Sequence, residues 1–436
     1  MPHNLRAVSL FSSAGIGDLG LSANGVDIIA SSEVVEQRHD VYRANFPSAH
    51  CFTGDLREHK QELIDYVHRE LNGEQLFLMM ATPPCQGMST NGAGKLLSEI
   101  RAGNRPPMDE RNRLIIPTMD VATALRPAWL ILENVPAMRN TLIIGRDGQP
   151  INLLDFVRSE LGSDYVGSSE VVSCSDYEVP QVRKRLITIL TRDPKGVAHF
   201  RNHGSLLPPK TTSSPITLRQ AIGHLPALDP CVGPASHSKF HPLHYVQRMS
   251  PEKHWWIRNT PEGETAFNNQ CAEAHCGHDE NARHIDISAT DRSSSKVRSA
   301  LFCAQCGNLL PRPSIFDKRT EERRLIKGFH SAYRRMRWDK PAHAVTRNFP
   351  FEASDNKIHP DQHRPLSILE AMIIQTIADY DFSFEINGKY ANRKVIADVI
   401  GESVPPRLID LIAEHILALV ADCKSSPSST ENELAA

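Results

Sequence analysis

This sequence lacks long apolar runs, a recognisable export signal and any internal repeat. The best candidate for a membrane span, residues 408–420, is interrupted by Asp410, Glu414 and His415, and no uninterrupted run reaches the ~18 residues that a span requires. The first residues carry one basic side chain, Arg6, before an apolar segment and show no small-residue cleavage site. We therefore expect neither a secretory peptide nor a membrane partner.

The composition is that of a globular enzyme rather than a disordered or collagen-like chain. Hydrophobic residues make up 40% and charged residues 23% of the 436 residues, a length that allows two or three domains. Nine cysteines form an odd number in a chain for which no export is expected. That count favours reduced thiols, a metal site or a catalytic thiol over a framework of disulfides.

The net charge of −2 hides an uneven distribution along the chain. Residues 196–350 contain 22 Lys and Arg against 13 Asp and Glu, a surplus of +9 that leaves −11 for the rest. A basic middle region on a nearly neutral protein favours a polyanionic partner, nucleic acid first. A solvated charged surface explains the same balance equally well, so charge alone does not decide between the two.

Short β-rich apolar runs alternate with helix-length segments over the first 190 residues. The predicted strands are Ala7–Phe11, Ile28–Glu33, Leu76–Ala81, Trp129–Leu132, Val171–Ser173 and Leu186–Leu190. The predicted helices include Gln61–Leu71, Leu114–Leu125, Leu366–Thr376 and Arg407–Ala421. This alternation predicts an α/β fold with a mainly parallel sheet and helices on both faces.

The character of the sequence changes after residue 192, where Pro, Ser, Gly and His become dense and long periodic runs disappear. We expect an α/β domain over residues 1–195, completed by residues 365–421 near the C-terminus. Residues 196–364 are expected to form a separate, smaller and irregular domain. The polar, Ser-rich tail 422–436 is expected to be disordered.

A glycine-rich turn follows the first predicted strand. Gly15, Gly17 and Gly20 fit the pattern G-x-G-x-x-G, which brings backbone close to a ligand at a helix N-terminus. Glu33 ends the next strand, where it can accept hydrogen bonds from ribose hydroxyls, and Asp55 follows a third strand, where it can meet a purine amine. These residues favour a nucleoside-bearing cofactor, either NAD or S-adenosyl-L-methionine. A glycine turn without a ligand is the alternative.

Cys85 directly follows a predicted strand, in the sequence Thr82-Pro83-Pro84-Cys85. Two prolines cannot extend a strand ladder or stand inside a helix, so they hold the cysteine on a stiff loop. That loop leaves the carboxyl end of a strand, which is where open α/β sheets bind ligands. The cysteine is therefore a candidate nucleophile, and a small loop residue without chemistry is the alternative.

The segment Pro84-Cys85-Gln86 resembles the catalytic motif of the DNA cytosine-5 methyltransferases, and other segments are similar to that family's motifs in order and spacing. These segments are 11–17, Glu33 with 42–47, 54–55, 109–114, 133–135, 181–185, 364–370 and 401–406. The resemblance implies a Rossmann-like methyltransferase domain and a smaller target-recognition domain. It also implies an enzyme of the bacterial restriction–modification type, which protects DNA from a cognate endonuclease.

The resemblance implies roles for four residues in methyl transfer. Cytosine C5 is a poor nucleophile, and a thiolate from Cys85 that adds at C6 would turn the ring into an enamine able to attack a methyl group. Glu133 would stabilise the charged ring through a hydrogen bond or a proton at N3. Arg183 and Arg185 alternate along a strand, so one can pair with Glu133 while the other holds the base carbonyl or a phosphate. A surface ion network is the alternative for the two arginines.

The same resemblance assigns S-adenosyl-L-methionine as the cofactor. Its pocket would be formed by Phe11, Ser13, Ala14, Gly15, Ile16, Gly17, Glu33, Asp55, Pro84, Leu114 and Ser403. The sequence departs from the family pattern at four positions. Ser13 and Ile16 stand where glycines are usual, Val35 replaces an acid, and Glu402 replaces an Asn. None of these departures removes a catalytic group.

Double-stranded DNA is the implied substrate, and the target base would be flipped out of the duplex at a cost of a few kcal/mol. The residues expected to contact DNA are Gln86, Ser89, Asn91 and Gln181. A basic run over residues 318–347 would add phosphate contacts in the region where the family places target recognition. We expect a monomer in the bacterial cytoplasm.

Two cysteine pairs, Cys271 with Cys276 and Cys303 with Cys306, are separated by 26 residues. Four thiolates in two close pairs suit a tetrahedral zinc ion, and His275, His278 or His284 could replace one ligand. We predict a structural zinc ion in an insert over residues 271–306. Ordinary free thiols are the alternative.

Three other functions stay open on the sequence alone. An RNA methyltransferase of the tRNA-modifying branch would share the motifs, and the basic, cysteine-bearing insert argues only weakly for DNA. A nicotinamide oxidoreductase would use the glycine turn but would leave Cys85, Glu133 and the two arginines unexplained. A non-enzymatic, zinc-containing DNA-binding protein conflicts with the intact set of Cys85, Glu133 and Arg183.

Overall fold

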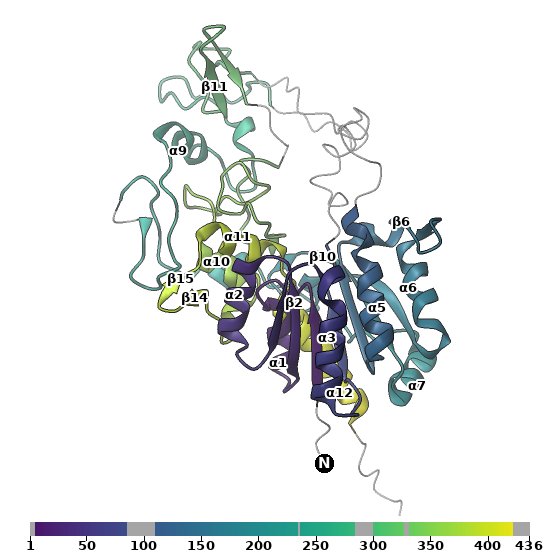
Figure 1. Cartoon of the computed structure of the whole chain (residues 1–436). Helices are drawn as coiled ribbons and strands as arrows, with labels where there is room; N and C mark the ends of the chain where they lie inside the picture. The colour runs from purple at the N-terminus through teal and green to yellow at the C-terminus, as the bar shows by residue number, and fades with distance from the viewer. Residues whose placement is uncertain (1–4, 85–109, 234–235, 284–299, 327–330, 422–436) are drawn as a thin grey trace, which may run out of the picture.

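The computed structural model describes residues 5–84, 110–233, 236–283, 300–326 and 331–421. The main body is a seven-stranded sheet, shown in the lower part of Figure 1. In spatial order its strands are β3 (His50–Thr53), β2 (Asp27–Glu33), β1 (Arg6–Leu10), β4 (Leu78–Ala81), β5 (Trp129–Asn134), β10 (Lys184–Thr191) and β8 (Val166–Ser173). The first five are parallel, and β10 is antiparallel to both of its neighbours. The prediction of a mainly parallel sheet is confirmed.

Strand residues alternate between two cores on opposite faces of the sheet. One core holds Leu10 and Met79, and it is covered by α3 (Leu56–Leu71), α5 (Ile115–Leu125) and α6 (Leu153–Leu161). The other core holds Leu78 and Met80, and α12 (Pro406–Val420) covers it. Because both faces are buried, β4 and β5 read as continuous apolar runs rather than as alternating patterns.

The remaining elements are short. The helices are α1 (Ile16–Ser22), α2 (Glu36–Asn45), α7 (Pro194–His203), α8 (Leu218–Ile222), α9 (Pro251–Arg258), α10 (Ile368–Ile374) and α11 (Arg393–Glu402). The strands are β6 (Leu142–Ile144), β7 (Pro150–Asn152), β9 (Gln181–Val182), β11 (Ser314–Asp317), β12 (Glu322–Leu325), β13 (Ala342–His343), β14 (Glu385–Ile386) and β15 (Lys389–Tyr390). Single 3₁₀ turns include η1 (Glu110–Leu114) and η2 (Pro136–Asn140). No helix in the described ranges is long and apolar enough to cross a membrane.

The last helix, α12, returns to the beginning of the chain and packs on α1. A Cβ atom at Gly20 of α1 would overlap the backbone of Pro406 and Asp410, so only glycine allows the two helices to lie this close. Asn24 donates a hydrogen bond of 2.7 Å from Nδ2 to Oδ1 of Asp410. The C-terminal helix α12 therefore covers one face of the sheet to which the N-terminal strands β1 and β2 belong.

The middle of the chain is irregular and stands apart from the sheet, with α9 and β11 farthest from it (Figure 1). A small core of Trp256, Phe267 and Tyr333 holds this part together. A separate core joins α8, α10 and α11 to Trp338 and Phe349. In Figure 1 α10 and α11 lie between the irregular part and the sheet.

Two elements begin five residues earlier than the sequence predicts. β8 begins at Val166, five residues before the expected Val171, because its polar start, Gly-Ser-Ser-Glu, pairs with β10 although it lacks a β-strand signal. α3 begins at Leu56 because Asp55 accepts a hydrogen bond of 2.9 Å from the backbone N–H of Arg57 and thereby caps the helix. The tail 422–436, expected to be disordered, lies outside the described residues.

Asp18 is an unusual acidic residue because it lies on α1 and its side chain is buried beneath the glycine turn. The hydroxyl of Ser9 donates a hydrogen bond of 2.8 Å to its Oδ1. Burial raises the pKa of Asp18 to about 7 from its ordinary 3.8, although hydrogen bonds to Ser9 and Tyr42 oppose the shift. The folded protein therefore binds a proton here that the unfolded chain releases at a lower pH.

We expect Asp18→Asn to stabilise the protein at pH 8 and to have a smaller effect at pH 5.5. A raised carboxyl pKa contributes stability that is complete below 3.8 and lost as the pH rises to about 7, and each pH unit in between costs about 1.4 kcal/mol. Urea unfolding at the two pH values measures the difference, with the exposed Asp27→Asn as the control. An equal effect at both values would contradict the raised pKa.

Candidate active site

Glu133 and Arg185 form an ion pair between the neighbouring strands β5 and β10, near the last residues of β5. Glu133 lies on β5 and Arg185 on the antiparallel neighbour β10, and Arg185 Nε lies 2.6 Å from Glu133 Oε1. Both side chains are almost completely buried. Burial raises the pKa of Glu133, while the charges of Arg185 and Arg183 partly offset that effect. Burial thus favours the protonated form of Glu133, while the two arginines favour its ionised form.

Two hydrogen bonds hold Thr82 and Pro83, which lie just before Cys85 in the chain. Asn134 donates a hydrogen bond of 2.8 Å from Nδ2 to the carbonyl oxygen of Pro83. The hydroxyl of Thr82 donates one of 2.9 Å to the carbonyl of Phe11 in the glycine turn. Cys85 itself, and Gln86, Ser89 and Asn91 with it, lie outside the described residues. Thr82 and Pro83 are nevertheless bound to the glycine turn and to Glu133's strand, respectively.

The two arginines of the 181–185 segment serve different partners. Arg185 makes the ion pair expected for one of them, whereas Arg183 is buried and donates to the carbonyls of Val345 at 2.7 Å and Gly401 at 3.1 Å. Burial lowers the pKa of Arg183 to about 9. Its guanidinium therefore binds backbone and joins segments distant in sequence, and neither a base nor a phosphate is needed to explain its position.

The structure contradicts the prediction that Gln181 contacts DNA. Its side chain is completely buried, and its Nε2 donates to the carbonyl of Ile374 at 3.0 Å. Its Oε1 accepts a hydrogen bond of 3.0 Å from the N–H of Val345. Both polar ends of the amide are thus used inside the protein.

The glycine turn lies beside the end of β2, and hydrogen bonds join the two. Gly15 has φ +82°, and a Cβ there would collide with the ring of Phe46, so this position requires glycine. Glu33 accepts hydrogen bonds from the backbone N–H groups of Ser13 at 3.0 Å and Val35 at 2.8 Å. Burial raises the pKa of Glu33. The carboxylate thus fixes the turn around the place expected for a ribose.

Among the described residues, the Oγ atom of Ser13 is buried without a hydrogen-bond partner. It offers an unused polar group inside the turn, beside the carboxylate of Glu33 and the rigid backbone at Gly15. This donor set fits the nucleoside and amino-acid ends of S-adenosyl-L-methionine. The other expected pocket residues, Ala14, Ile16, Gly17, Pro84 and Leu114, are likewise described, and of these Ala14 and Ile16 belong to the hydrophobic core.

Asp55, expected to bind the adenine amine, faces an internal partner. Its carboxylate accepts hydrogen bonds from Arg57 Nε at 3.0 and 3.1 Å, and this contact lowers the pKa of Asp55. Glu402, which departs from the family pattern, forms a salt bridge of 2.8 Å with Arg38 of α2. Glu402, the last residue of α11, therefore ties the end of that helix to α2, the helix that follows Glu33.

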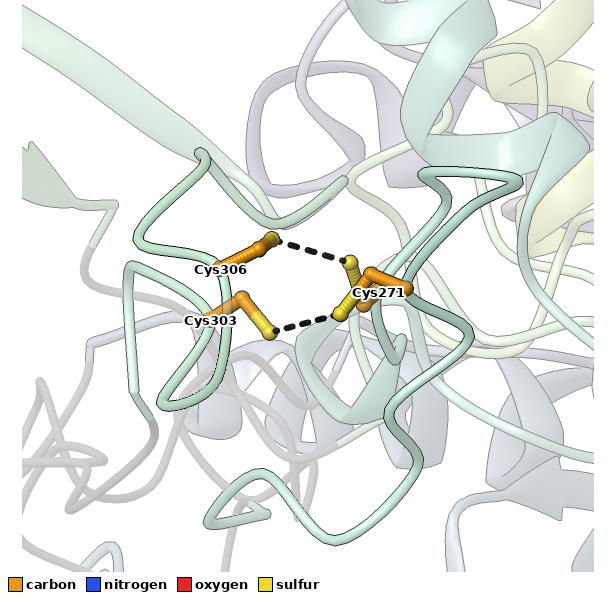
Figure 2. A group of neighbouring side chains, drawn as sticks. Cys271, Cys303 and Cys306 are labelled. Carbon is orange, nitrogen blue, oxygen red and sulfur yellow. Dashed lines mark hydrogen bonds between the residues drawn. The ribbon is translucent and has the colours of Figure 1, made fainter.

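The four predicted metal ligands gather in the irregular part of the chain. Figure 2 shows Cys271 facing Cys306, with a sulfur–sulfur distance of 3.7 Å, and Cys276 lies 3.8 Å from Cys303. All four sulfur atoms lie within 4.8 Å of one another. Zn–S bonds of ~2.3 Å place the sulfurs of a tetrahedral site roughly 3.8 Å apart, so the spacing suits zinc.

The basic run at 318–347 is only partly available to a partner. Arg335 is buried and donates to four backbone carbonyls, those of Thr260, His359, Gln362 and Ile257. Arg337 pairs with Asp339 on the surface. The prediction that this run serves phosphate contacts is therefore wrong for Arg335.

Sequence reasoning missed Gln375 near the end of the helix expected at 366–376. Its amide is completely buried and donates to the carbonyl of Ile400 at 2.6 Å and to Oγ of Ser403 at 3.1 Å. An isolated amide in an otherwise apolar helix was the available signal. Such a group must find internal partners when it is buried.

Comparisons with known proteins agree with this arrangement. The Type II methyltransferase M1.HgaI of Avibacterium volantium is 30% identical over 426 residues, which cover 95% of this chain and 99% of the relative. The Type II methyltransferase M1.HphI of Haemophilus parahaemolyticus is 25% identical over 416 residues, which cover 95% of this chain and 87% of that protein.

Solved structures support the fold. A DNA modification methyltransferase encoded within an Escherichia coli prophage superposes with a TM-score of 0.57 at 16% identity and covers 95% of this chain and 99% of its own. The Entamoeba histolytica methyltransferase EhMeth gives a TM-score of 0.52 at 14% identity, over 96% and 99%. The family model for C-5 cytosine-specific DNA methylases matches residues 5–418. The chain therefore belongs to the C-5 cytosine-specific DNA methylases.

Proposed function

We propose that this DNA cytosine-5 methyltransferase modifies one specific double-stranded sequence and so protects DNA from a partner endonuclease. The observation that carries the proposal is the buried Glu133–Arg185 pair, next to which Asn134 binds the carbonyl of Pro83, two residues before Cys85 in the chain. The match to two named Type II methyltransferases over almost their full lengths supports a restriction–modification role and disfavours an RNA substrate. We further propose that the enzyme acts as a monomer in the bacterial cytoplasm.

Methyl transfer requires a nucleophile at C6 of the cytosine and a proton donor at N3. The Cys85 thiolate forms a bond to C6, while Glu133 gives its proton to N3 and so neutralises the ring. S-Adenosyl-L-methionine, when bound, supplies the methyl group that C5 takes up. C5 then gives up its proton to water, the Cys85 thiolate leaves C6, and N3 returns its proton to Glu133, which restores the aromatic ring. Each bond made to Cys85 is thus broken again before the product leaves.

Arg185 orients the acid, and the turn at Gly15 holds the cofactor. The guanidinium of Arg185 contacts Oε1 of Glu133 and so orients the carboxyl group. Glu33 and Ser13 would bind the ribose and the amino-acid end of the cofactor, and Ser403 would close the pocket. The positive charges of Arg183 and Arg185 lie near Glu133 and favour negative charge developing on the base.

We also propose that Cys271, Cys276, Cys303 and Cys306 bind one structural zinc ion. The two cysteine turns are held by short backbone hydrogen bonds, such as Cys303 N–H to the Asn308 carbonyl at 2.8 Å. Arg312 joins the flanking segments by donating to the carbonyls of Asn269, Ala282 and Ala300. An irregular segment with few apolar contacts gains its rigidity from such a metal.

We expect Cys85→Ser to abolish methyl transfer while S-adenosylhomocysteine still binds, because a hydroxyl is far less ionised than a thiol. Transfer of tritiated methyl to unmethylated phage DNA and calorimetric binding measure the two effects. DNA with 5-fluorocytosine should form a stable covalent adduct only with the wild type. Cys51→Ser serves as the matched control, and substantial turnover by Cys85→Ser would refute the nucleophile.

Glu133→Gln should slow turnover by ~100- to 10,000-fold, because the amide keeps the shape but has no proton to deliver. Binding of S-adenosylhomocysteine should change little. The control is Glu170→Gln. Glu170 lies on β8, which pairs with β10, and it stands opposite Ile187 in the sheet. A loss of less than threefold in single-turnover methylation would remove Glu133 from the mechanism.

Elemental analysis of protein purified without a chelator should give one zinc ion per chain. Cys303→Ala should lose the metal and weaken specific DNA binding, whereas Cys231→Ala, at an exposed cysteine outside the cluster, should keep both. Binding of S-adenosylhomocysteine at the Gly15 turn should persist in both variants. Absence of zinc, or zinc retained after loss of two cluster cysteines, would leave these residues as ordinary thiols.

A further inference from the structure

One residue, Val345, has both of its backbone polar groups bound by side chains of the 181–185 segment. Its N–H donates 3.0 Å to Gln181 Oε1, and its carbonyl accepts 2.7 Å from Arg183 Nη1. β13, three residues earlier, pairs in parallel with β9, which contains Gln181. The segment 336–347 continues directly from the irregular part of the chain. Within this segment the carbonyl of Trp338 accepts a hydrogen bond from the backbone N–H of Arg219.

The same two side chains are also connected to residues 400–403, the last residues of α11 and Ser403 after them. Gln181 Nε2 donates to Oε1 of Gln375. Gln375 Nε2 in turn donates to the carbonyl of Ile400 at 2.6 Å and to Oγ of Ser403 at 3.1 Å. Arg183 completes a parallel connection, because its Nη2 donates to the Gly401 carbonyl. Two buried amides thus form an uninterrupted chain of hydrogen bonds from Val345 to Ser403.

We call Gln181 and Gln375 together the amide relay, and both of its side chains are tightly constrained. Both side chains have no exposed surface, so a displaced partner could not be replaced by water without opening the core. Gly401 adds a steric constraint, since a Cβ there would overlap the backbone of Thr346 and Arg347. A shift of residues 345–347 must therefore be accompanied by a shift of residues 400–403, because otherwise hydrogen bonds inside the core are lost.

We propose that Gln181 and Gln375 are positioning residues that couple DNA recognition to cofactor binding. DNA bound by the irregular part of the chain displaces or restrains the attached 336–347 segment, and the relay transmits that change from Val345 to Ser403 in the cofactor pocket; by reciprocity the cofactor favours the DNA-binding arrangement. This inference rests on the proposed function, in which Ser403 belongs to the cofactor pocket. It assigns to Gln181 a role in place of the DNA contact that its burial rules out.

The coupling is measured as the ratio of S-adenosylhomocysteine affinities with and without unmethylated phage DNA, using the full-length protein. We expect a ratio of about 5 or more for the wild type. Gln375→Met and Gln181→Met keep the volume of the side chain but remove the hydrogen bonds, and each should bring the ratio close to one. The double variant should give the same ratio as either single variant, because each of the three variants interrupts the same chain of hydrogen bonds. The KM for the methyl donor should rise while single-turnover methylation at saturating cofactor changes little.

Asn24→Leu is the matched control, because Asn24 also joins distant segments through its amide but stands outside the relay. It should keep the wild-type ratio. Hydrogen exchange on the wild type gives a second measurement that needs no variant: phage DNA alone should slow exchange at residues 398–405. Unchanged ratios in both relay variants, or no protection of 398–405 by DNA, would overturn the relay. A wild type that transfers no methyl group to DNA would instead overturn the proposed function.

Discussion

The contact on which the active-site end of the sheet depends is the buried ion pair of Glu133 and Arg185. An ionised group that leaves water must find an opposite charge or hydrogen bonds, so burial of the carboxyl requires the guanidinium. Ile187 stands directly opposite Glu133 in the ladder, which makes Arg185 its diagonal neighbour on the same face. A register slip of one residue would turn Arg185 to the other face and leave the acid unpaired.

The antiparallel strand β10 is what makes this contact possible. A parallel strand at this edge would have to begin at the other end of the sheet, and its first residues would lie far from the end of β5. Because β10 runs the other way, its first residues stand beside the last residues of β5. The acid, its cation and the loop anchored by Asn134 are therefore brought together by one strand pair and one neighbouring turn.

The parts of the fold that bury continuous apolar runs could be predicted from the sequence, because burial on both faces leaves a clear mark. β5 and β4 are examples. β8 was only half recognised, since Ser168 and Ser169 gain their strand conformation from pairing with β10 rather than from their own preference. The sequence predicts a DNA contact for Gln181, whose side chain is buried, because a sequence pattern does not say whether an amide faces solvent or the core.

The cysteine spacing pointed to a cluster, and the four sulfurs do lie together. The course of the chain around them was not predictable, because it is set by single hydrogen bonds rather than by a repeating pattern. The same holds for the two bonds that connect Asn134 and Thr82 to their distant carbonyls. Neither has a periodic signature in the sequence.

The basic surplus of the middle region has a structural component as well as a possible electrostatic one. Irregular backbone leaves carbonyl groups without ladder partners, and each buried carbonyl needs a donor. A guanidinium carries five N–H donors, so Arg335 and Arg312 each satisfy several carbonyls at once, and burial lowers the pKa of both to about 10. These charges cannot also face DNA. The surplus of +9 in residues 196–350 therefore overstates the charge that a nucleic acid meets, and recognition must rely on fewer surface cations.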